Sequence, residues 1–249
     1  MSEARRLEKE VVLAATPEQV WEAIATGPGV ASWFMPMDIE AGVGGAVSLG
    51  GTVTAWEPGR RLEVRAGGPD GDSAQAFEYL IEARDGGSTV LRFVQTGFQG
   101  EGWEAEYEAM SRGWDMYFHT LDQYLTHFPG RTAAYVDAEA PAESAGERGW
   151  AVVMAGLGLP GAAAAGDRVR LAPDGLEPIE GVVDYLTPAH TSPTFLGLRT
   201  ADAMYRLHGR AGMGMPVAVG HHLFAAGVDV DRVRKAWQAW LEGLFPASA

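Results

Sequence analysis

Cysteine is missing from this chain of 249 residues. Its absence excludes disulfide bonds, a thiolate nucleophile and cysteine-ligated zinc, and it fits a cytoplasmic protein. Basic residues are few, because 19 Lys and Arg stand against 33 Asp and Glu, a net charge of -14 at pH 7. No basic run offsets the repulsion from phosphates, so we expect no nucleic-acid partner.

No targeting segment is recognisable in this sequence either. No apolar segment approaches the length that spans a bilayer, so we expect no membrane insertion. The first residues, MSEARRLEKEV, have no apolar core of the kind that a signal peptide carries. Together with the lack of cysteine, this favours a cytoplasmic location.

The motifs of common catalytic and metal sites are also absent. The sequence contains neither HExxH nor GxSxG. His221 and His222 are adjacent on a predicted strand, so their side chains point to opposite faces and do not readily share a metal ion. His119 and His127 are two helical turns apart, too far to share one. We predict no metal, no cofactor and no recognisable catalytic constellation.

One long helix is predicted from Trp103 to Phe128, followed by the stop signal Pro129-Gly130. Its apolar residues recur at steps of three and four, which places them on one face. These residues are Trp103, Tyr107, Met110, Trp114, Phe118, Leu121 and Leu125. A face with so many aromatic rings must lie against a large apolar surface.

The residues before this helix predict a strand, two short helices and a run of antiparallel strands. Residues 7–15 are predicted to form the first strand. Thr16, Pro17 and Gln19 are typical of a capped helix start. Gly27-Pro28-Gly29 is expected to end that helix, and a second short helix is expected at 30–34. Strands are then predicted at 46–49, 51–57, 61–66, 76–83 and 89–96, with a hairpin turn at 85–88.

This order of elements, together with several sequence stretches, resembles a known family. The stretches are TPEQVWEAIATGPGVASWF, the Gly44-Gly45 pair, EPGRRLE, STVLRFVQTGF and the Gly113-Trp114 pair. Residues 7–128 resemble the homologues of the activator of heat-shock-protein ATPase, within the helix-grip fold of the SRPBCC superfamily (START and pollen-allergen relatives). The resemblance implies an α+β fold in which a curved antiparallel sheet wraps around the long helix.

The second half repeats the order of elements without repeating the residues. We predict a strand at 132–138, a short helix at 149–159, strands at 168–172, 181–186, 194–199, 203–208 and 216–225, and a last helix at 229–245. Asp229 is the expected N-cap of that helix. We interpret the chain as two tandem helix-grip domains, 1–130 and 131–249, the second degenerate. An antiparallel extension without a cavity of its own is the alternative.

A helix-grip fold leaves a pocket where side chains do not fill the space between sheet and helix. The expected ligand-binding residues are Trp33, Phe34, Val53, Phe77, Tyr79, Phe93, Trp103, Tyr107, Trp114, Tyr117, Phe118 and Leu121. The same aromatic residues would equally make an ordinary core. Tyr and Trp would supply a few orienting hydrogen-bond donors.

Three functions stay open from the sequence. The first is binding or carriage of a small hydrophobic molecule. The second is a cyclase- or dehydratase-like activity on a polyketide-type or aromatic ligand, with Asp115 and His119, four residues apart on the helix, as base and orienter. That pair is also an ordinary pair of surface residues. The third, implied by the resemblance, is regulation of a chaperone ATPase or another protein interaction. A homodimer stays open too.

Overall fold

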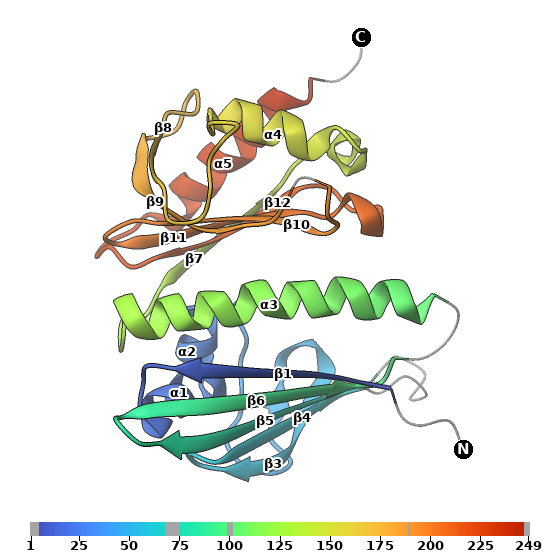
Figure 1. The fold of residues 1–249 in the computed structure, drawn as a ribbon, viewed down its shortest axis with the longest axis vertical. Coiled ribbons are helices and arrows are strands. Elements are labelled where there is room, and N and C mark those ends of the chain that lie inside the picture. Colours follow the sequence, from blue (N-terminus) through green and yellow to red (C-terminus); the bar gives the residue numbers. More distant parts are fainter. Residues whose placement is uncertain (1–4, 68–74, 99–101, 189, 247–249) are drawn as a thin grey trace. The chain divides into compact units, whose positions relative to one another are not determined.

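The computed structural model describes residues 5–67, 75–98, 102–188 and 190–246. The chain divides into two compact units, Met1–Thr132 and Ala133–Ala249. Each unit holds a six-stranded antiparallel sheet and its own helices (Figure 1). The α+β class predicted from the sequence is confirmed.

In the N-terminal unit, two short helices and five strands lie between the first strand and the long helix. The sheet has the strand order β1-β6-β5-β4-β3-β2. The elements are β1 (Arg6–Leu13), α1 (Pro17–Ala25), α2 (Gly27–Ala31), β2 (Ala46–Val47), the 3-10 turn η1 (Ser48–Gly50), β3 (Gly51–Glu57), β4 (Arg61–Ala66), β5 (Gln75–Arg84), β6 (Ser88–Thr96) and α3 (Trp103–His127).

Helix α1 begins at the capping box that the sequence predicts. The Thr16 hydroxyl accepts from the backbone N–H of Gln19, and the Gln19 side chain accepts from the N–H of Thr16 at 2.9 Å. Both bonds satisfy donors that a helix start leaves without partners. The cap fixes where the chain turns from β1 into the helix.

Helix α2 corrects the sequence prediction. Gly27-Pro28-Gly29 was expected to be a break, but these residues form the first turn of α2. The Thr26 hydroxyl caps that turn by accepting from Gly29 N–H at 3.1 Å, and proline is well tolerated in a first turn. Gly29 is needed because a Cβ there would lie 2.0 Å from the Glu22 carbonyl oxygen of α1.

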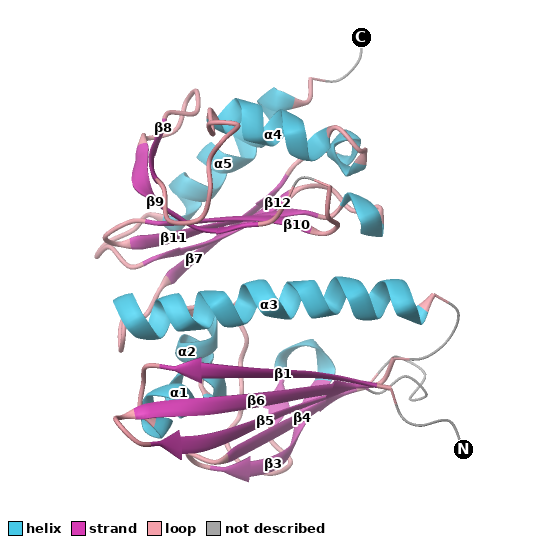
Figure 2. Ribbon diagram, in the orientation of Figure 1, coloured by secondary structure: helices cyan, strands magenta, loops and turns pink. Residues whose placement is uncertain are grey.

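The first sheet has one polar and one apolar face. Along β4, Leu62 and Val64 face inward while Arg61 and Glu63 face outward, as the period of a strand requires. Arg61 joins Glu63 and Glu78 in ion pairs of 2.9 and 2.7 Å on the outer face. Helix α3 runs along this sheet (Figure 2). The alternation seen in the sequence therefore marks the side that α3 covers.

Packed aromatic side chains fill part of the space between α3 and its sheet. The Phe93 ring of β6 lies 4.3 Å from the Trp114 ring and 5.2 Å from the Phe118 ring, centroid to centroid. Phe118 also stacks on Trp33 at 6.3 Å. Leu121 is completely buried one turn further along the helix. This end of the α3 face is a filled core.

The C-terminal unit repeats the fold. Its sheet has the order β7-β12-β11-β10-β9-β8, which matches the first sheet strand for strand. Its elements are β7 (Ala134–Glu139), η2 (Ala142–Ala145), α4 (Gly149–Leu157), β8 (Arg168–Leu171), β9 (Ile179–Leu186), β10 (Thr194–Arg199), β11 (Ala203–Gly209), η3 (Ala211–Met213), β12 (Ala218–Leu223) and α5 (Val230–Leu244). The prediction of two tandem copies is confirmed.

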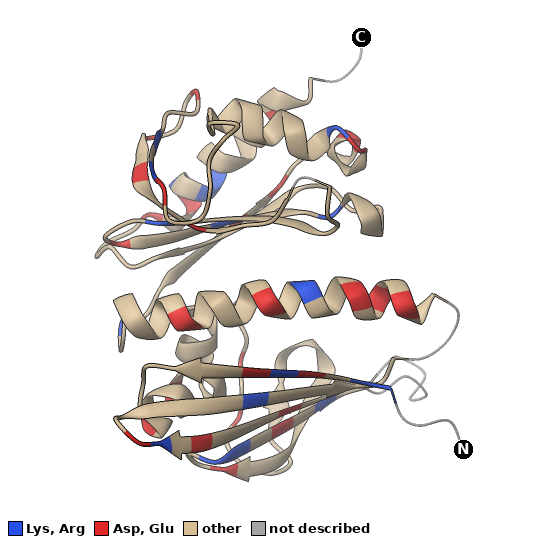
Figure 3. Cartoon of the chain, viewed as in Figure 1, with Lys and Arg blue, Asp and Glu red and all other residues tan. Residues whose placement is uncertain are grey.

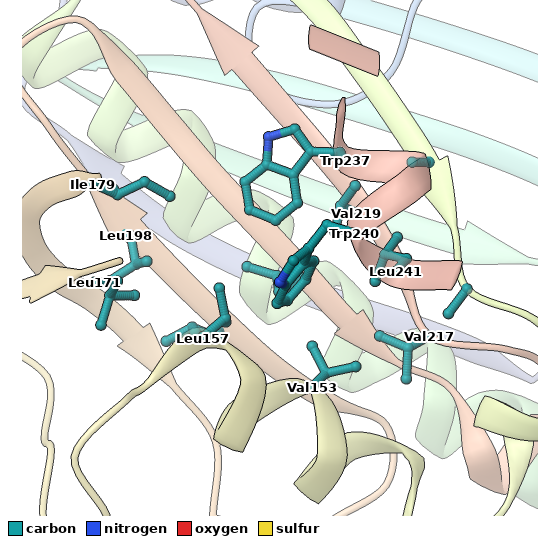
Figure 4. Packing of buried hydrophobic residues seen from close by; sticks show 14 of the residues in the cluster. Val153, Leu157, Leu171, Ile179, Leu198, Val217, Val219, Trp237, Trp240 and Leu241 are labelled. Atoms are coloured by element: carbon teal, nitrogen blue, oxygen red, sulfur yellow. The ribbon is translucent and has the colours of Figure 1, made fainter. Parts of the chain in front are cut away.

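Helix α5 closes the second core. It begins at Asp229, whose carboxylate accepts from Arg232 N–H at 3.0 Å, as the sequence predicts. Trp237 and Trp240 of this helix pack edge to face, 5.4 Å apart. Figure 4 shows their rings among Val153 and Leu157 of α4 and the inward side chains of the sheet. Large side chains therefore fill the centre of this unit.

An ion pair crosses the second sheet. Arg206 of β11 reaches Asp184 of β9 through two hydrogen bonds of 3.0 and 2.7 Å. The two side chains are 2% and 4% exposed. The pair spans the intervening strand β10 at Gly197, where a Cβ would lie 2.5 Å from the Asp184 carboxylate. The missing side chain of Gly197 leaves the space that this bidentate ion pair occupies.

Candidate functional site

The N-terminal unit contains an apolar cavity of about 280 Å³. One wall is the inner face of the paired strands β4 and β5. Three cross-strand pairs form it: Leu62 with Tyr79, Val64 with Phe77, and Ala66 with Gln75. Alternate residues of a strand share a face, so this wall follows directly from the register.

The rest of the lining comes from the stretch that runs from the end of α1 to the start of β3 and from one residue of α3. Trp114 is the α3 residue among the described lining side chains. The other lining residues are Ile24, Val30, Trp33, Phe34, Met35, Met37, Ile39, Val47, Ser48, Leu49 and Gly51. Most of these are apolar, and two methionines add side chains that adapt to irregular shapes.

Indole and amide groups at the wall are already hydrogen-bonded. Trp33 Nε1 donates to the Ala23 carbonyl at 2.9 Å, and Trp114 Nε1 donates to Gln95 Oε1 at 2.7 Å. The Gln95 amide bonds Gln75 at 3.4 Å, and the Gln75 amide donates to Glu106 at 3.2 Å. This chain of bonds engages the polar atoms at one end of the cavity.

Tyr79 is different. Its ring packs 5.0 Å from Phe93, and its hydroxyl has no hydrogen-bond partner among the described residues. Burial raises the pKa of the Tyr79 phenol well above its ordinary value, so the group stays protonated at physiological pH. The cavity lining therefore includes a neutral hydrogen-bond donor, the Tyr79 hydroxyl, that has no acceptor among the described residues.

The mouth of the cavity includes an unusual leucine. Leu49 lines the cavity, yet its side chain is 82% exposed. Its φ of 68° lies in the left-handed region, which side chains other than Gly, Asn and Asp rarely adopt. The strand expected at 46–49 ends at Val47 because the chain turns here, through Ser48 and Leu49.

The structure brings together five of the twelve side chains expected to bind ligand. Trp33, Phe34, Phe77, Tyr79 and Trp114 line the cavity. The other seven are not among its described lining residues, and they are Val53, Phe93, Trp103, Tyr107, Tyr117, Phe118 and Leu121.

Those seven have other surroundings. Phe93, Phe118 and Leu121 belong to the filled core, and Val53 is buried in β3. Tyr117 packs against Phe34 at 4.4 Å. Trp103 and Tyr107, at the start of α3, have other partners. The Arg5 guanidinium lies 4.0 Å from the centre of the Trp103 ring, and the Tyr107 ring packs 5.2 Å from the Phe98 ring. The cavity lies toward β4 and β5 instead of along the whole helix.

Sequence reasoning missed the lining residues of the loop after α2. Met35, Met37 and Ile39 stand at every second position, the spacing of a segment with one apolar face. This alternation is visible in the sequence, but Pro36 between Met35 and Met37 suggests only the end of a helix. Leu62 and Val64 alternate with charged residues along their strand, and only the fold shows that a cavity lies before them.

The acid–base pair considered on α3 is not part of the cavity lining. Asp115 forms an ion pair with Lys9 of β1 at 2.6 Å, and its side chain is 51% exposed. Neither Asp115 nor His119 is among the described residues that line the cavity. The charge of Asp115 is therefore balanced by Lys9 of the strand β1.

A larger depression, of about 560 Å³, lies in the C-terminal unit. It is lined by Tyr205 and Trp237 but also by charged side chains, among them Glu177, Asp202 and Arg232. Charged groups in contact with water make it a surface hollow, less suited to an apolar molecule. Within the described residues, no His, Asp and Glu side chains gather in threes as metal ligands.

Comparison with a family model decides the relationship of the first unit. Residues 14–126 match the model described as Activator of Hsp90 ATPase homolog 1-like protein. The N-terminal unit belongs to this family. The cavity of this activator-homolog unit, from Ile24 to Trp114, lies within the matched residues. The resemblance read from the sequence is confirmed. No curated protein gives a significant sequence match to the chain.

Solved structures resemble the chain in part. Protein MLL2253 from Mesorhizobium loti is 26% identical, with 50% of this chain and 98% of that one covered and a TM-score of 0.44. The Aha1 dimer from Colwellia psychrerythraea is 20% identical over 49% of this chain and 96% of that one, with a TM-score of 0.42. DynU16, a putative protein in the dynemicin biosynthetic locus, is 16% identical and covers 96% of both chains, with a TM-score of 0.43. Such similarities assign no function to this chain.

None of the helices in the described part of the chain is long and apolar enough to cross a membrane.

Proposed function

We propose that the N-terminal unit binds a small hydrophobic molecule in the cavity between β4, β5, the loop after α2 and Trp114. The observation that carries this proposal is the cavity itself, about 280 Å³ of space with a nearly continuous apolar lining. Folding normally fills a core to the density of an organic crystal, so a void of this size lowers stability, and a bound ligand would offset that cost.

Lining chemistry and size support the same role. Ligand sites are concave and mostly apolar, with a few polar groups that fix orientation. The volume is about that of nine water molecules in the liquid, which suits a compact molecule on the order of ten to fifteen non-hydrogen atoms. The twelve residues expected to bind ligand reduce, in this proposal, to the five that line the cavity.

The test is a matched pair of substitutions. Ala66 faces the cavity, whereas Ala76, on the neighbouring strand, alternates to the outer face. Ala66→Phe should abolish saturable binding of 2-isopropenylnaphthalene in equilibrium dialysis, and Ala76→Phe should leave it intact. Equal binding by the wild-type chain and Ala66→Phe would refute the site.

Fewer observations support the two alternative functions. A cyclase-like activity needs polar groups at the ligand, and Asp115, His119 and Tyr117 are not among the described lining residues. Regulation of a chaperone ATPase rests on the family description alone. A purified Hsp90-type chaperone whose ATPase rate rises with added protein would favour this role over simple ligand binding.

A further inference from the structure

The polar composition of the cavity restricts its ligand. Among the described lining residues there is no Lys, Arg or His, and no Asp or Glu. A carboxylate or an ammonium group inside would therefore be buried without a counter-ion, which costs far more than burial of a neutral group. Figure 3 shows where charges do occur in this unit, on the strands and along α3. The ligand that fits is neutral.

Hydrogen-bonding groups restrict it further. Both lining indoles donate to the protein, and the Gln75 amide is engaged at both ends. The Ser48 hydroxyl oxygen accepts from Asp38 N–H at 2.8 Å, next to the exposed Leu49 at the mouth. The Tyr79 hydroxyl remains as a donor of the lining that has no hydrogen-bond partner among the described residues.

Tyr79 adds a hydroxyl to a wall that is otherwise mostly apolar, and the residue is partly buried there. Phenylalanine would fill the same place between Leu62 and Phe93 but would offer a ligand no hydrogen-bond donor. Ligand sites commonly combine an apolar lining with a few polar groups that fix orientation. The Tyr79 hydroxyl is the group in this wall that can meet an acceptor arriving with the ligand.

We propose that the cavity selects a neutral apolar molecule with one hydrogen-bond acceptor, such as a ketone or ester carbonyl, and that the Tyr79 hydroxyl donates to this acceptor. The inference rests on the proposed function and adds to it the chemical class of the ligand. Tyr79 is then a positioning and specificity residue, since it orients the molecule and discriminates against hydrocarbons and acids of the same shape.

Three probes of equal size test this. They are 2-acetylnaphthalene, 2-isopropenylnaphthalene and 2-naphthoate, which place a ketone, a hydrocarbon and a carboxylate at one position. Dissociation constants are measured by equilibrium dialysis for the wild-type chain, Tyr79→Phe and Tyr107→Phe. Tyr107 lies on α3 outside the described lining, so its variant loses one hydroxyl away from the cavity.

The ketone should bind the wild-type chain roughly three- to tenfold more tightly than the hydrocarbon, the range expected of one neutral hydrogen bond. Tyr79→Phe should remove that difference by weakening only the ketone, and Tyr107→Phe should preserve it. The carboxylate should bind at least about tenfold more weakly than the ketone in all three proteins, because nothing offsets its charge.

The other outcomes separate this inference from the proposed function. If ketone and hydrocarbon bind equally and Tyr79→Phe changes neither, while Ala66→Phe abolishes both, the cavity binds apolar molecules but Tyr79 selects nothing. If the carboxylate binds most tightly, the neutral class is wrong. If no probe binds the wild-type chain, both the proposed function and the inference fail.

Discussion

His221 should make the stability of the C-terminal unit depend on pH. The β11–β12 pairing is interrupted between Met204–His222 and Leu207–Val219. In this gap the Arg206 backbone N–H donates to His221 Nδ1 at 3.1 Å. Nδ1 must therefore be unprotonated, and the neutral imidazole carries its hydrogen on Nε2.

The surroundings of the ring oppose a second proton. His221 is completely buried, and its ring lies 4.3 Å from Trp237 of α5 and 5.0 Å from Tyr205 of β11, centroid to centroid. Burial, followed by the charges of His222, His208 and Arg206, lowers the pKa of His221 well below 6.5. Nε2 has no hydrogen-bond partner among the described residues that would offset a charge.

The sign and size of the effect follow from linkage. The unfolded histidine binds a proton near pH 6.5, whereas folded His221 does so only at much lower pH. Acid therefore favours the unfolded unit. The contribution of His221 is fully present above pH 6.5 and is lost as the pH falls toward the folded-state pKa. Between pH 7.5 and 5.5 the free energy of unfolding should drop by about 1.4 kcal/mol from this residue alone.

Urea unfolding at several pH values measures this, with pulsed hydrogen exchange and mass spectrometry reporting on β11 and β12 peptides. His221→Gln keeps an acceptor for the Arg206 N–H but does not titrate. Its unfolding free energy should start lower, because packing on Trp237 is lost, and should fall less steeply with acid. His190→Gln, at an exposed loop position, should follow the wild-type slope. Parallel slopes in the wild type and His221→Gln would refute the reasoning.

Three further outcomes are expected. Thr16→Ala should lower the unfolding free energy of the N-terminal unit by about 1 kcal/mol, measured by urea denaturation, because the α1 cap is lost; an unchanged value would contradict the cap. Arg206→Met should lower the unfolding free energy of the C-terminal unit by about 3–5 kcal/mol, because it leaves the Asp184 carboxylate buried without its partner. The double variant Arg206→Met/Asp184→Leu should recover most of that unfolding free energy. If the double variant is no more stable than Arg206→Met, the penalty does not come from the carboxylate. Leu49→Asn should raise the melting temperature of the N-terminal unit by a few degrees. Asparagine tolerates the left-handed conformation better than leucine, which should add about 0.5–1 kcal/mol to the unfolding free energy. A lower melting temperature would mean that the exposed leucine side chain contributes packing.

Elements with a clear period were predictable from the sequence. The expected bounds of β3, β4 and β10 equal those observed, because alternation and turn residues define them locally. Helix α2 was misplaced, since its start depends on the Thr26 cap and on the contact of Gly29 with α1, neither of which has a sequence period.

The cavity was harder to predict than the fold. A stripe of aromatic residues on α3 indicates a large apolar neighbour, but packing decides where that neighbour leaves space. Phe93 of β6 packs against Phe118 of the helix and fills one end, whereas the small Gly51 and Ala66 leave the other end open. The difference depends on which residues of distant segments meet, and no local pattern records it.

Trp114 provides an optical property of the site. Its side chain lines the cavity while its N–H donates to Gln95, so a ligand that entered would contact the indole without competing for that hydrogen bond. Indole emission shifts to shorter wavelengths when water beside the ring is replaced by an apolar molecule. Trp114 would thus be an intrinsic fluorophore whose emission reports whether the cavity holds water or an apolar ligand, and Trp114→Phe would remove its share of that signal while leaving Trp33 in the wall.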